Sequence, residues 1–240
     1  MIQLLRYQLS VHVRMISTYV MVLFVIIAFR LAGAPVPAET ANFTAMSTAS
    51  FLIAWITLTF VLQITGFQFV FFRSEALQYR IARLRNRPLI IGGALIHVLL
   101  LALLASIPYA VIYVGMVEDL RIASLAWANM VLFNAFLGIA TLTISRFTGT
   151  GLITPILVLI VLFLLPISLS AMGPFAPAFL QHPVGEAIKT LLSSHLDVSG
   201  NADMLLMRGI QDTDAVVRTL ILTPILATIT YVHFLRGDHH

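Results

Sequence analysis

Six apolar stretches, each close to the roughly 20 residues that a bilayer-spanning helix needs, dominate this sequence. They contain no acidic residue and no Lys. They run over residues 16–31, 48–72, 89–114, 122–144, 152–172 and 215–235. Of the 240 residues, 60% are hydrophobic and 10% are charged, whereas a soluble globular chain carries about 25% charged residues. The sequence therefore predicts an all-α polytopic membrane protein with six transmembrane helices, in a single transmembrane domain over residues 1–240.

Positive charge is concentrated between the second and third stretches. Five arginines lie there, Arg73, Arg80, Arg83, Arg85 and Arg87. Short loops rich in Arg stay on the cytoplasmic side. No Pro or Gly interrupts residues 74–87, so we predict a cytoplasmic helix over 73–87 that Pro88 stops. Its apolar stripe of Leu77, Ile81 and Leu84 suits either a soluble partner or a layer of anionic lipid.

The charges in the other loops test this orientation. With both termini in the cytoplasm, nine basic residues face two acidic ones inside, and five basic residues face eight acidic ones outside. Glu118, Asp119 and Arg121 form a tight external turn in this layout, and Arg146 closes the fourth stretch before a turn over 147–151. The bias toward internal positive charge predicts a multi-pass cell-membrane protein.

Two further segments are not simple spans. Residues 1–15 alternate apolar and polar side chains, which predicts an interfacial helix before the first span. Residues 173–214 form a long external segment that begins with three prolines and continues with a short helix over 186–196. This external segment is either a lid close to the membrane surface or an ordinary surface loop.

The sequence offers no catalytic constellation. The polar residues within the spans, apart from Ser and Thr, are Gln63, Gln68, His97, Asn129 and Asn134, and such residues usually form hydrogen bonds between neighbouring helices. There is no cysteine, and no pair of histidines is spaced for a metal on a span, so we predict no metal site and no cofactor. Buried carboxylates, which ion-coupled transporters usually carry, are missing from the spans.

The complete arrangement resembles the permease subunit of ABC-2 type (type V) ABC exporters. The resemblance is architectural: an interfacial helix, six spans, a charged helix after span two and a hydrophobic external segment before span six. In that family the helix after span two is a coupling helix that sits on a separate ATPase subunit. Many members have an acidic residue there followed by a turn with Gly; here Glu75 is present and the next Gly is Gly92.

The resemblance implies a function and a set of partners. The chain would be a permease that is not itself an enzyme, with ATP hydrolysis on a partner ABC ATPase. A second permease copy or a sister permease would complete the pore, and a lipidic or amphipathic substrate would leave between them. The residues implied in the ATPase contact are Arg73, Glu75, Leu77, Arg80, Ile81 and Leu84. Membrane lipid is expected around the chain, and nucleic acid is not a partner. The alternatives are a non-transport membrane-anchor subunit of a larger complex and an intramembrane enzyme.

Overall fold

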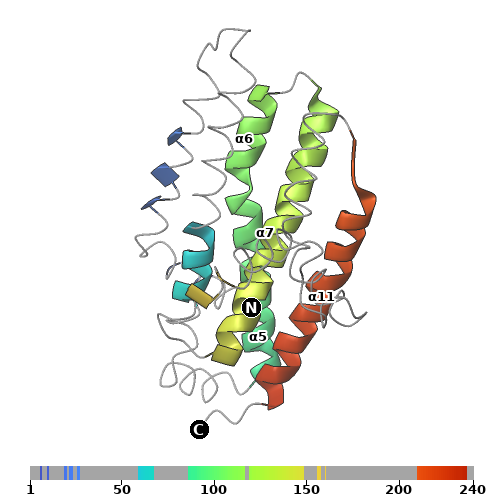
Figure 1. Ribbon diagram of the computed structural model, residues 1–240. Coiled ribbons are helices and arrows are strands. Elements are labelled where there is room, and N and C mark those ends of the chain that lie inside the picture. Colours follow the sequence, from blue (N-terminus) through green and yellow to red (C-terminus); the bar gives the residue numbers. More distant parts are fainter. Residues whose placement is uncertain are drawn as a thin grey trace.

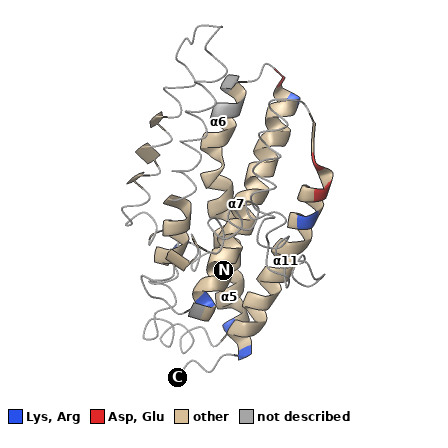
Figure 2. Cartoon of the chain, viewed as in Figure 1, with Lys and Arg blue, Asp and Glu red and all other residues tan. Residues whose placement is uncertain are grey.

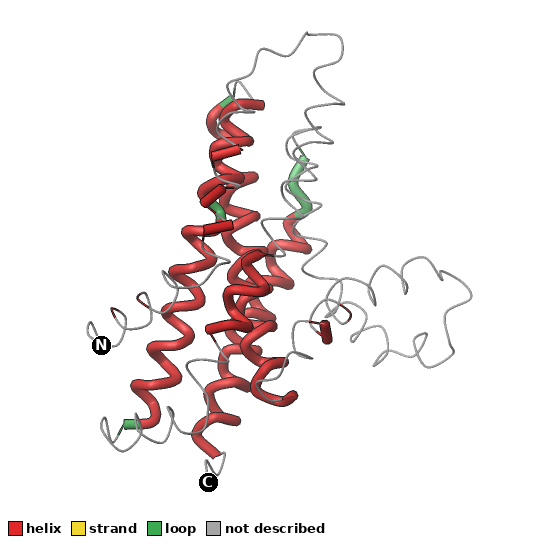
Figure 3. The backbone as a smooth tube through the Cα atoms, turned by 90° about the vertical axis from the view of Figure 1, so that its left-hand side faces the viewer, coloured by secondary structure: helices red, strands yellow, loops and turns green. Residues whose placement is uncertain are grey.

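The computed structural model describes residues 6, 10, 19–20, 22–23, 26–27, 59–67, 86–116, 119–148, 156–157, 160 and 210–236. Nearly all of these residues are helical, and none of them is in a strand (Figure 3). Three helical stretches are long and apolar enough to cross a membrane, Arg87–Val111, Leu120–Phe147 and Thr213–Arg236. The predicted all-α membrane class is therefore confirmed, while the count of six spans stays a prediction.

The predicted third span consists of two helices in line. Helix α5 covers Arg87–Ala105 and helix α6 covers Ile107–Met116, with Ser106 in a turn between them. Pro108 explains the interruption, because a proline has no N–H to donate to the carbonyl four residues earlier and its ring crowds that carbonyl. Together the two helices extend the predicted span, residues 89–114, by two residues at each end.

Helix α7 covers Leu120–Thr148, and helix α11 covers Thr213–Arg236. Both are longer than predicted from the apolar stretches. Arg121, expected in a turn, lies in the first turn of α7, and Phe147 and Thr148, expected in the next turn, continue the same helix. Hydrophobicity marks only the part of a helix that lies in hydrocarbon, so its charged and polar ends were assigned to the loops.

Helices α5, α7 and α11 each have, at or just before their first turn, a short polar side chain that accepts backbone hydrogen bonds. The Asn86 Oδ1 atom accepts from Leu89 N at 3.1 Å, and Asp119 Oδ1 accepts from Arg121 N at 2.8 Å. Asp212 Oδ1 accepts from the backbone N atoms of residues 214 and 215 at 3.0 and 3.3 Å. Such caps satisfy N–H groups that have no partner within the helix.

The cap at Asn86 corrects the predicted role of Pro88. We expected Pro88 to stop a helix over 73–87. Instead Arg87 is the first residue of α5, and Pro88 lies in its first turn, where a missing N–H costs nothing. The described part of the third span therefore begins after Asn86, which is not helical.

Helix α7 contacts α5, α6 and α11, and α11 also contacts α5 (Figure 1). Helices α5 and α6 run in one direction, and α7 and α11 both run in the opposite direction (Figure 1). The short connection between Met116 and Asp119 accounts for the antiparallel packing of α6 on α7. The parallel pair α7 and α11 is joined by a chain segment of more than 60 residues.

The interior of this unit is filled by apolar side chains from residues 59–67 and from the long helices. Its largest fully buried side chains are Tyr109, Phe60, Phe67, Phe136, Phe234, Ile64, Ile90, Ile91 and Met130. Gly138 of α7 lies at a close contact between the helices. A Cβ atom placed there would lie 2.7 Å from Val98 Cγ1 and 3.0 Å from Phe60 Cζ. The absence of a side chain at Gly138 thus lets α5 and residues 59–67 approach the α7 backbone.

Large apolar side chains also cover the outside of the unit. Helix α5 exposes Leu99, Leu100, Leu103 and Leu104, and α11 exposes Val217, Leu220, Ile221, Ile225, Ile229 and Val232. A water-soluble monomer rarely exposes so continuous an apolar surface, whereas the surface of a membrane span is expected to look like this.

The charges in the described helices lie at their ends (Figure 2). Arg87 at the start of α5, Arg146 near the end of α7 and Arg236 at the end of α11 lie at the same end of the unit, which we call the basic end. The three acidic residues of the described part, Asp119, Asp212 and Asp214, lie toward the other end. We call that end the acidic end, although Arg121 and Arg218 lie there too.

Candidate functional site

The six residues expected to contact an ATPase, Arg73, Glu75, Leu77, Arg80, Ile81 and Leu84, lie outside the described residues. The structure does place the point where their segment joins the membrane unit. That point is Asn86 and Arg87, at the basic end. Of residues 1–15, predicted to be an interfacial helix, only residues 6 and 10 are described, and both are helical. Of residues 173–214, predicted to be external, only residues 210–214 are described.

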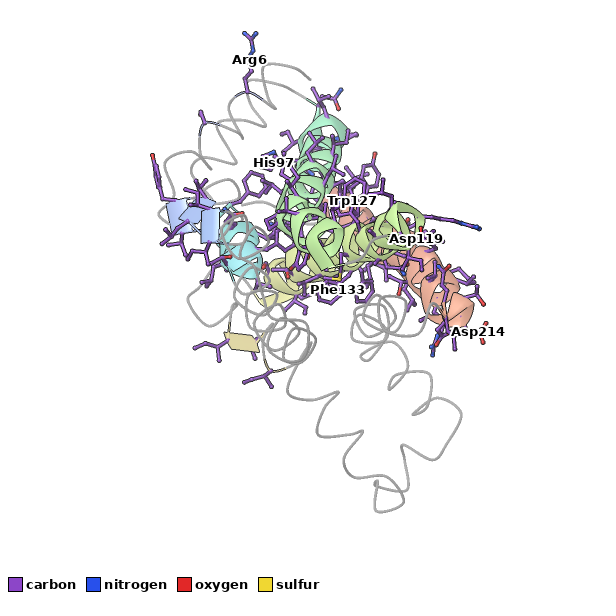
Figure 4. The ribbon with its side chains drawn as sticks, turned by 90° about the horizontal axis from the view of Figure 1, so that it is seen from above. Arg6, His97, Asp119, Trp127, Phe133 and Asp214 are labelled. Carbon is purple, nitrogen blue, oxygen red and sulfur yellow. The ribbon has the colours of Figure 1, made fainter. Side chains whose placement is uncertain are left out.

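A buried polar cluster lies instead at the break between α5 and α6. It consists of Ala102, Ser106, Trp127 and Asn134, and we call it the Ser106 cluster. Asn134 Nδ2 donates to Ser106 Oγ at 2.8 Å, and Ser106 Oγ donates to the Ala102 carbonyl at 2.7 Å. Trp127 Nε1 donates to the Ser106 carbonyl at 3.0 Å. Two side chains of α7 thus hold one residue of the broken span, and Trp127 lies where α6 meets α7 (Figure 4).

Two sequence features produce this cluster: the helical spacing of Trp127 and Asn134, and Pro108 in the opposing span. Trp127 and Asn134 are seven residues apart, which is two helical turns, so they lie on the same side of α7. Pro108 interrupts the backbone ladder of the opposing span, and the Ser106 carbonyl at that position accepts from both Ala110 N at 3.2 Å and Trp127 Nε1. Interhelical bonds from the side chains of α7 therefore meet the span at its point of interruption.

The chemistry of the Ser106 cluster is that of hydrogen bonding alone. None of its side chains titrates near neutral pH, so it has no general acid or base. Asn134 Oδ1 is buried and has no hydrogen-bond partner in the part of the chain that the structure describes. Asn134 was predicted to form a hydrogen bond to a neighbouring helix, and it does, but Ser106 and Trp127 were not identified from the sequence. Two sequence features could have pointed to them. Pro108 is a proline within a span, and the indole N–H of Trp127 needs an acceptor when it is buried.

Two other polar residues of the spans are buried among apolar neighbours on the other side of α5. The ring of His97 lies 4.8 Å from the ring of Phe67, tilted by 40°. His97 and Gln63 are each only 1% exposed. They belong to the packing between α5 and residues 59–67, separate from the Ser106 cluster. Asn129 is also buried, on α7, and its Nδ2 atom has no partner among the described residues. Gln68 lies outside them.

At the basic end, α7 and α11 are joined by aromatic contacts. The Arg146 guanidinium carbon lies 5.2 Å from the centroid of the Phe234 ring, and the rings of Phe147 and His233 are 4.4 Å apart. One turn further into the membrane, the hydroxyls of Thr143 and Thr230 share a hydrogen bond of 2.6 Å. Within the described ranges no group of three or more His, Asp or Glu could hold a metal ion.

No protein-family model, no curated protein and no solved structure matches this chain.

Proposed function

We propose that the chain is the permease subunit of an ATP-driven exporter of the ABC-2 (type V) kind. The proposal rests on the architectural resemblance of the whole sequence. The structural observation that best supports the proposal is the position of Asn86 and Arg87. The arginine-rich segment predicted over 73–87 joins the membrane unit at the basic end, the end at which Arg146 and Arg236 also lie. Basic ends of short-looped spans face the cytoplasm, where an ATPase would be found.

The direction of the helices supports the six-span layout. The chain leaves α7 at the basic end and enters α11 at the acidic end (Figure 1). It must therefore cross the length of the unit an odd number of times in between, because polar loops do not run through lipid. The single apolar stretch over 152–172 supplies one crossing. A span six that runs from outside to inside then leaves the C-terminus in the cytoplasm.

Helix α5 is the element through which an ATPase would act on the membrane part. In the proposed mechanism the ATPase binds the face formed by Arg73, Glu75, Leu77, Arg80, Ile81 and Leu84. Nucleotide-driven closure then moves this face, and the motion enters α5 at Asn86. A second permease copy or a sister permease forms the other half of the pathway. The absence of acidic residues and Lys from the predicted spans favours a lipidic or amphipathic substrate over a small ion.

The test is recovery of an ATPase with the tagged permease, and it uses two variants that add the same charge. Ile81→Glu places a carboxylate on the apolar stripe, whereas Tyr79→Glu places it about 200° around the helix from Ile81. An unpaired charge buried in a contact costs about 3–5 kcal/mol. We expect a nucleotide-hydrolysing subunit to co-purify with the wild type and with Tyr79→Glu, and at least tenfold less of it with Ile81→Glu.

The readouts are the amount of ATPase per permease and the ATP hydrolysis of the purified complex, at equal membrane levels of each permease. Equal recovery with Ile81→Glu would remove this stripe from the contact and leave it as a lipid-facing surface. If no ATPase is recovered with any of the three chains, the exporter proposal is wrong and the chain is better described as a membrane-anchor subunit.

A further inference from the structure

The charges of the described helices are divided unevenly between the two ends of the unit (Figure 2). Within residues 86–148 and 210–236, the basic end has three arginines, Arg87, Arg146 and Arg236, and no acidic residue, which gives a net charge of +3. The acidic end has three aspartates and two arginines, which gives a net charge of −1. Among these residues the basic end therefore has no counter-charge of its own, and it attracts anionic groups.

Arg236 is the basic residue that the exposed surface of α11 leads to. Its side chain is exposed and forms no hydrogen bond or ion pair with the described residues. It ends a line of exposed side chains on α11, which we call the α11 stripe and which consists of Ile225, Ile229, Val232 and Arg236. These residues are four, three and four positions apart, which places them within about 60° of the helix circumference. The α11 stripe is thus apolar along its length and cationic at its end.

His233 lies beside the charged end of the α11 stripe. It is about 60° around the helix from Arg236, on the side where its ring contacts the ring of Phe147 of α7 at 4.4 Å. The His233 side chain is only partly buried. Its Nδ1 atom is buried and has no hydrogen-bond partner among the described residues, so Nε2 is the ring nitrogen that an outside group can approach. Arg236 and a protonated His233 Nε2 therefore offer neighbouring N–H donors at the basic end.

We infer that the α11 stripe, together with His233, is a binding site for an anionic phospholipid. The phosphate group accepts hydrogen bonds from the Arg236 guanidinium and from His233 Nε2, because charged N–H donors form strong hydrogen bonds to phosphate. One acyl chain lies along the apolar residues Val232, Ile229 and Ile225. A zwitterionic phospholipid fits the same apolar surface, but the cation of its headgroup is repelled by the net positive charge of the basic end. The site therefore selects lipids by charge.

The length of the α11 stripe argues for a lipid and against a soluble anion. Ile229 is about 10 Å along the helix from Arg236, which is within the half-thickness of the hydrocarbon, about 15 Å. A ligand that contacts both residues needs an anionic head and an apolar tail of at least that length. This inference depends neither on the exporter proposal nor on the orientation of the chain in the membrane.

Fluorescence quenching by brominated lipids measures which lipid lies on the α11 stripe. The chain has no cysteine, so Ile229→Cys carries a single bimane fluorophore on the purified full chain. The labelled chain is placed in nanodiscs of phosphatidylcholine with increasing fractions of either brominated phosphatidylglycerol or brominated phosphatidylcholine. We expect half-maximal quenching at an about fivefold lower fraction of brominated phosphatidylglycerol, which corresponds to the roughly 1 kcal/mol that one arginine contributes near anionic lipid.

Leu220→Cys is the matched control position for the fluorophore. Leu220 is also exposed on α11, and it lies seven residues from Thr213 at the acidic end, as Ile229 lies seven residues from Arg236. The two fluorophores are therefore at similar distances from the two ends of α11. We expect the two brominated lipids to quench the fluorophore at Leu220→Cys equally.

Three substitutions identify the groups that select the lipid at the labelled position 229. Arg236→Gln should bring the ratio of the two half-maximal fractions close to one. His233→Phe keeps an aromatic ring against Phe147 and should lower the ratio in part. Arg121→Gln is the control, because it also removes an exposed arginine but at the acidic end, and it should leave the ratio at about five.

The inference is wrong if the two lipids quench the fluorophore at Ile229→Cys equally. It is also wrong if the preference persists in Arg236→Gln or is as large at Leu220→Cys, because the selection would then come from the net charge of the chain. Absence of quenching by both lipids at Ile229→Cys would mean that a second copy or another protein segment covers the α11 stripe. The nanodiscs contain no ATPase, so failure of this test is distinct from failure of the exporter proposal.

Discussion

The hydroxyl of Thr143 on α7 lies 2.6 Å from the hydroxyl of Thr230 on α11, and this hydrogen bond sets the register of the two helices. The neighbouring contacts, Arg146 with Phe234 and Phe147 with His233, follow the same register toward the basic end. In a bilayer, contacts of this kind matter because hydrophobic burial alone does not favour one helix neighbour over another or over lipid. The α7–α11 pair thus combines apolar packing with a few specific contacts.

The bond between Thr143 and Thr230 should contribute a small but measurable energy. Interhelical hydrogen bonds in membranes contribute about 0.6 kcal/mol on average and up to about 1.7 kcal/mol. We expect Thr143→Val and Thr230→Val to be coupled by about that amount in a double-mutant cycle of unfolding in mixed micelles. Thr228→Val is the control, because Thr228 is exposed and bonds only Pro224 O of its own helix. If the two valine substitutions change the free energy of unfolding additively, the hydrogen bond between Thr143 and Thr230 contributes no coupling between the two helices.

Gly138 should tolerate no larger side chain. A Cβ at this position would overlap Val98 Cγ1 at 2.7 Å, and overpacking of this kind costs about 1–3 kcal/mol. We expect Gly138→Val to lower the thermal unfolding temperature of the purified protein in detergent by several degrees, since β-branching leaves its side chain little freedom to avoid Val98. Gly92→Ala is the matched control, with nothing within 4 Å of its Cβ. A similar loss in both variants would argue against close packing at Gly138.

The topology can be tested with single cysteines in a chain that has none of its own. We expect a membrane-impermeant maleimide added to intact cells to label Leu120→Cys and Ile210→Cys at the acidic end. Both side chains are exposed, at 67% and 56%. Gln78→Cys should be labelled only after the membrane is permeabilised, because we propose that the basic end faces the cytoplasm. Labelling of Gln78→Cys in intact cells would reverse the orientation and remove the proposed ATPase contact.

The cap of α5 should be needed where the span meets the arginine-rich segment. Asn86→Ala removes the acceptor of Leu89 N, a change that costs about 1 kcal/mol in typical helices. We expect amide exchange at Leu89 and Ile90 to become faster, as measured by hydrogen–deuterium exchange and mass spectrometry. Asn86→Asp keeps the acceptor and should leave exchange slow. Equal protection in Asn86→Ala would mean that lipid or another group satisfies these amides.

Hydrophobicity along the sequence located the described spans well, for a physical reason. A helix in a bilayer must satisfy its own backbone hydrogen bonds and present apolar side chains to lipid, so length and composition nearly define it. The cores of the third, fourth and sixth predicted spans coincide with the described helices. The errors lie at the ends, where polar residues such as Asp119 and Asn86 cap helices that continue beyond the hydrocarbon.

The Ser106 cluster was harder to predict because it depends on which faces of two helices meet. Nothing in the sequence alone pairs Ser106 with Asn134 across 28 positions, or shows that Gly138 receives Val98. Pro108 was not identified as an interruption of the predicted span over 89–114, and the sequence does not show that Trp127 donates to the Ser106 carbonyl. The residues proposed for the ATPase contact lie outside the described part, so that contact stays a prediction of the sequence.

The 29 residues of α7 have a consequence for the thickness of the surrounding bilayer. At 1.5 Å per residue the helix is about 44 Å long, against about 30 Å of hydrocarbon. Its Asp119 cap and its Arg146 therefore reach the headgroup layers even when the helix tilts, and a thicker membrane can be matched by a more upright helix. Because α6 is tied to the start of α7, a change of tilt in α7 carries α6 with it and reaches Ser106. We therefore expect lipid chain length to act on the same residue at which the third span is interrupted.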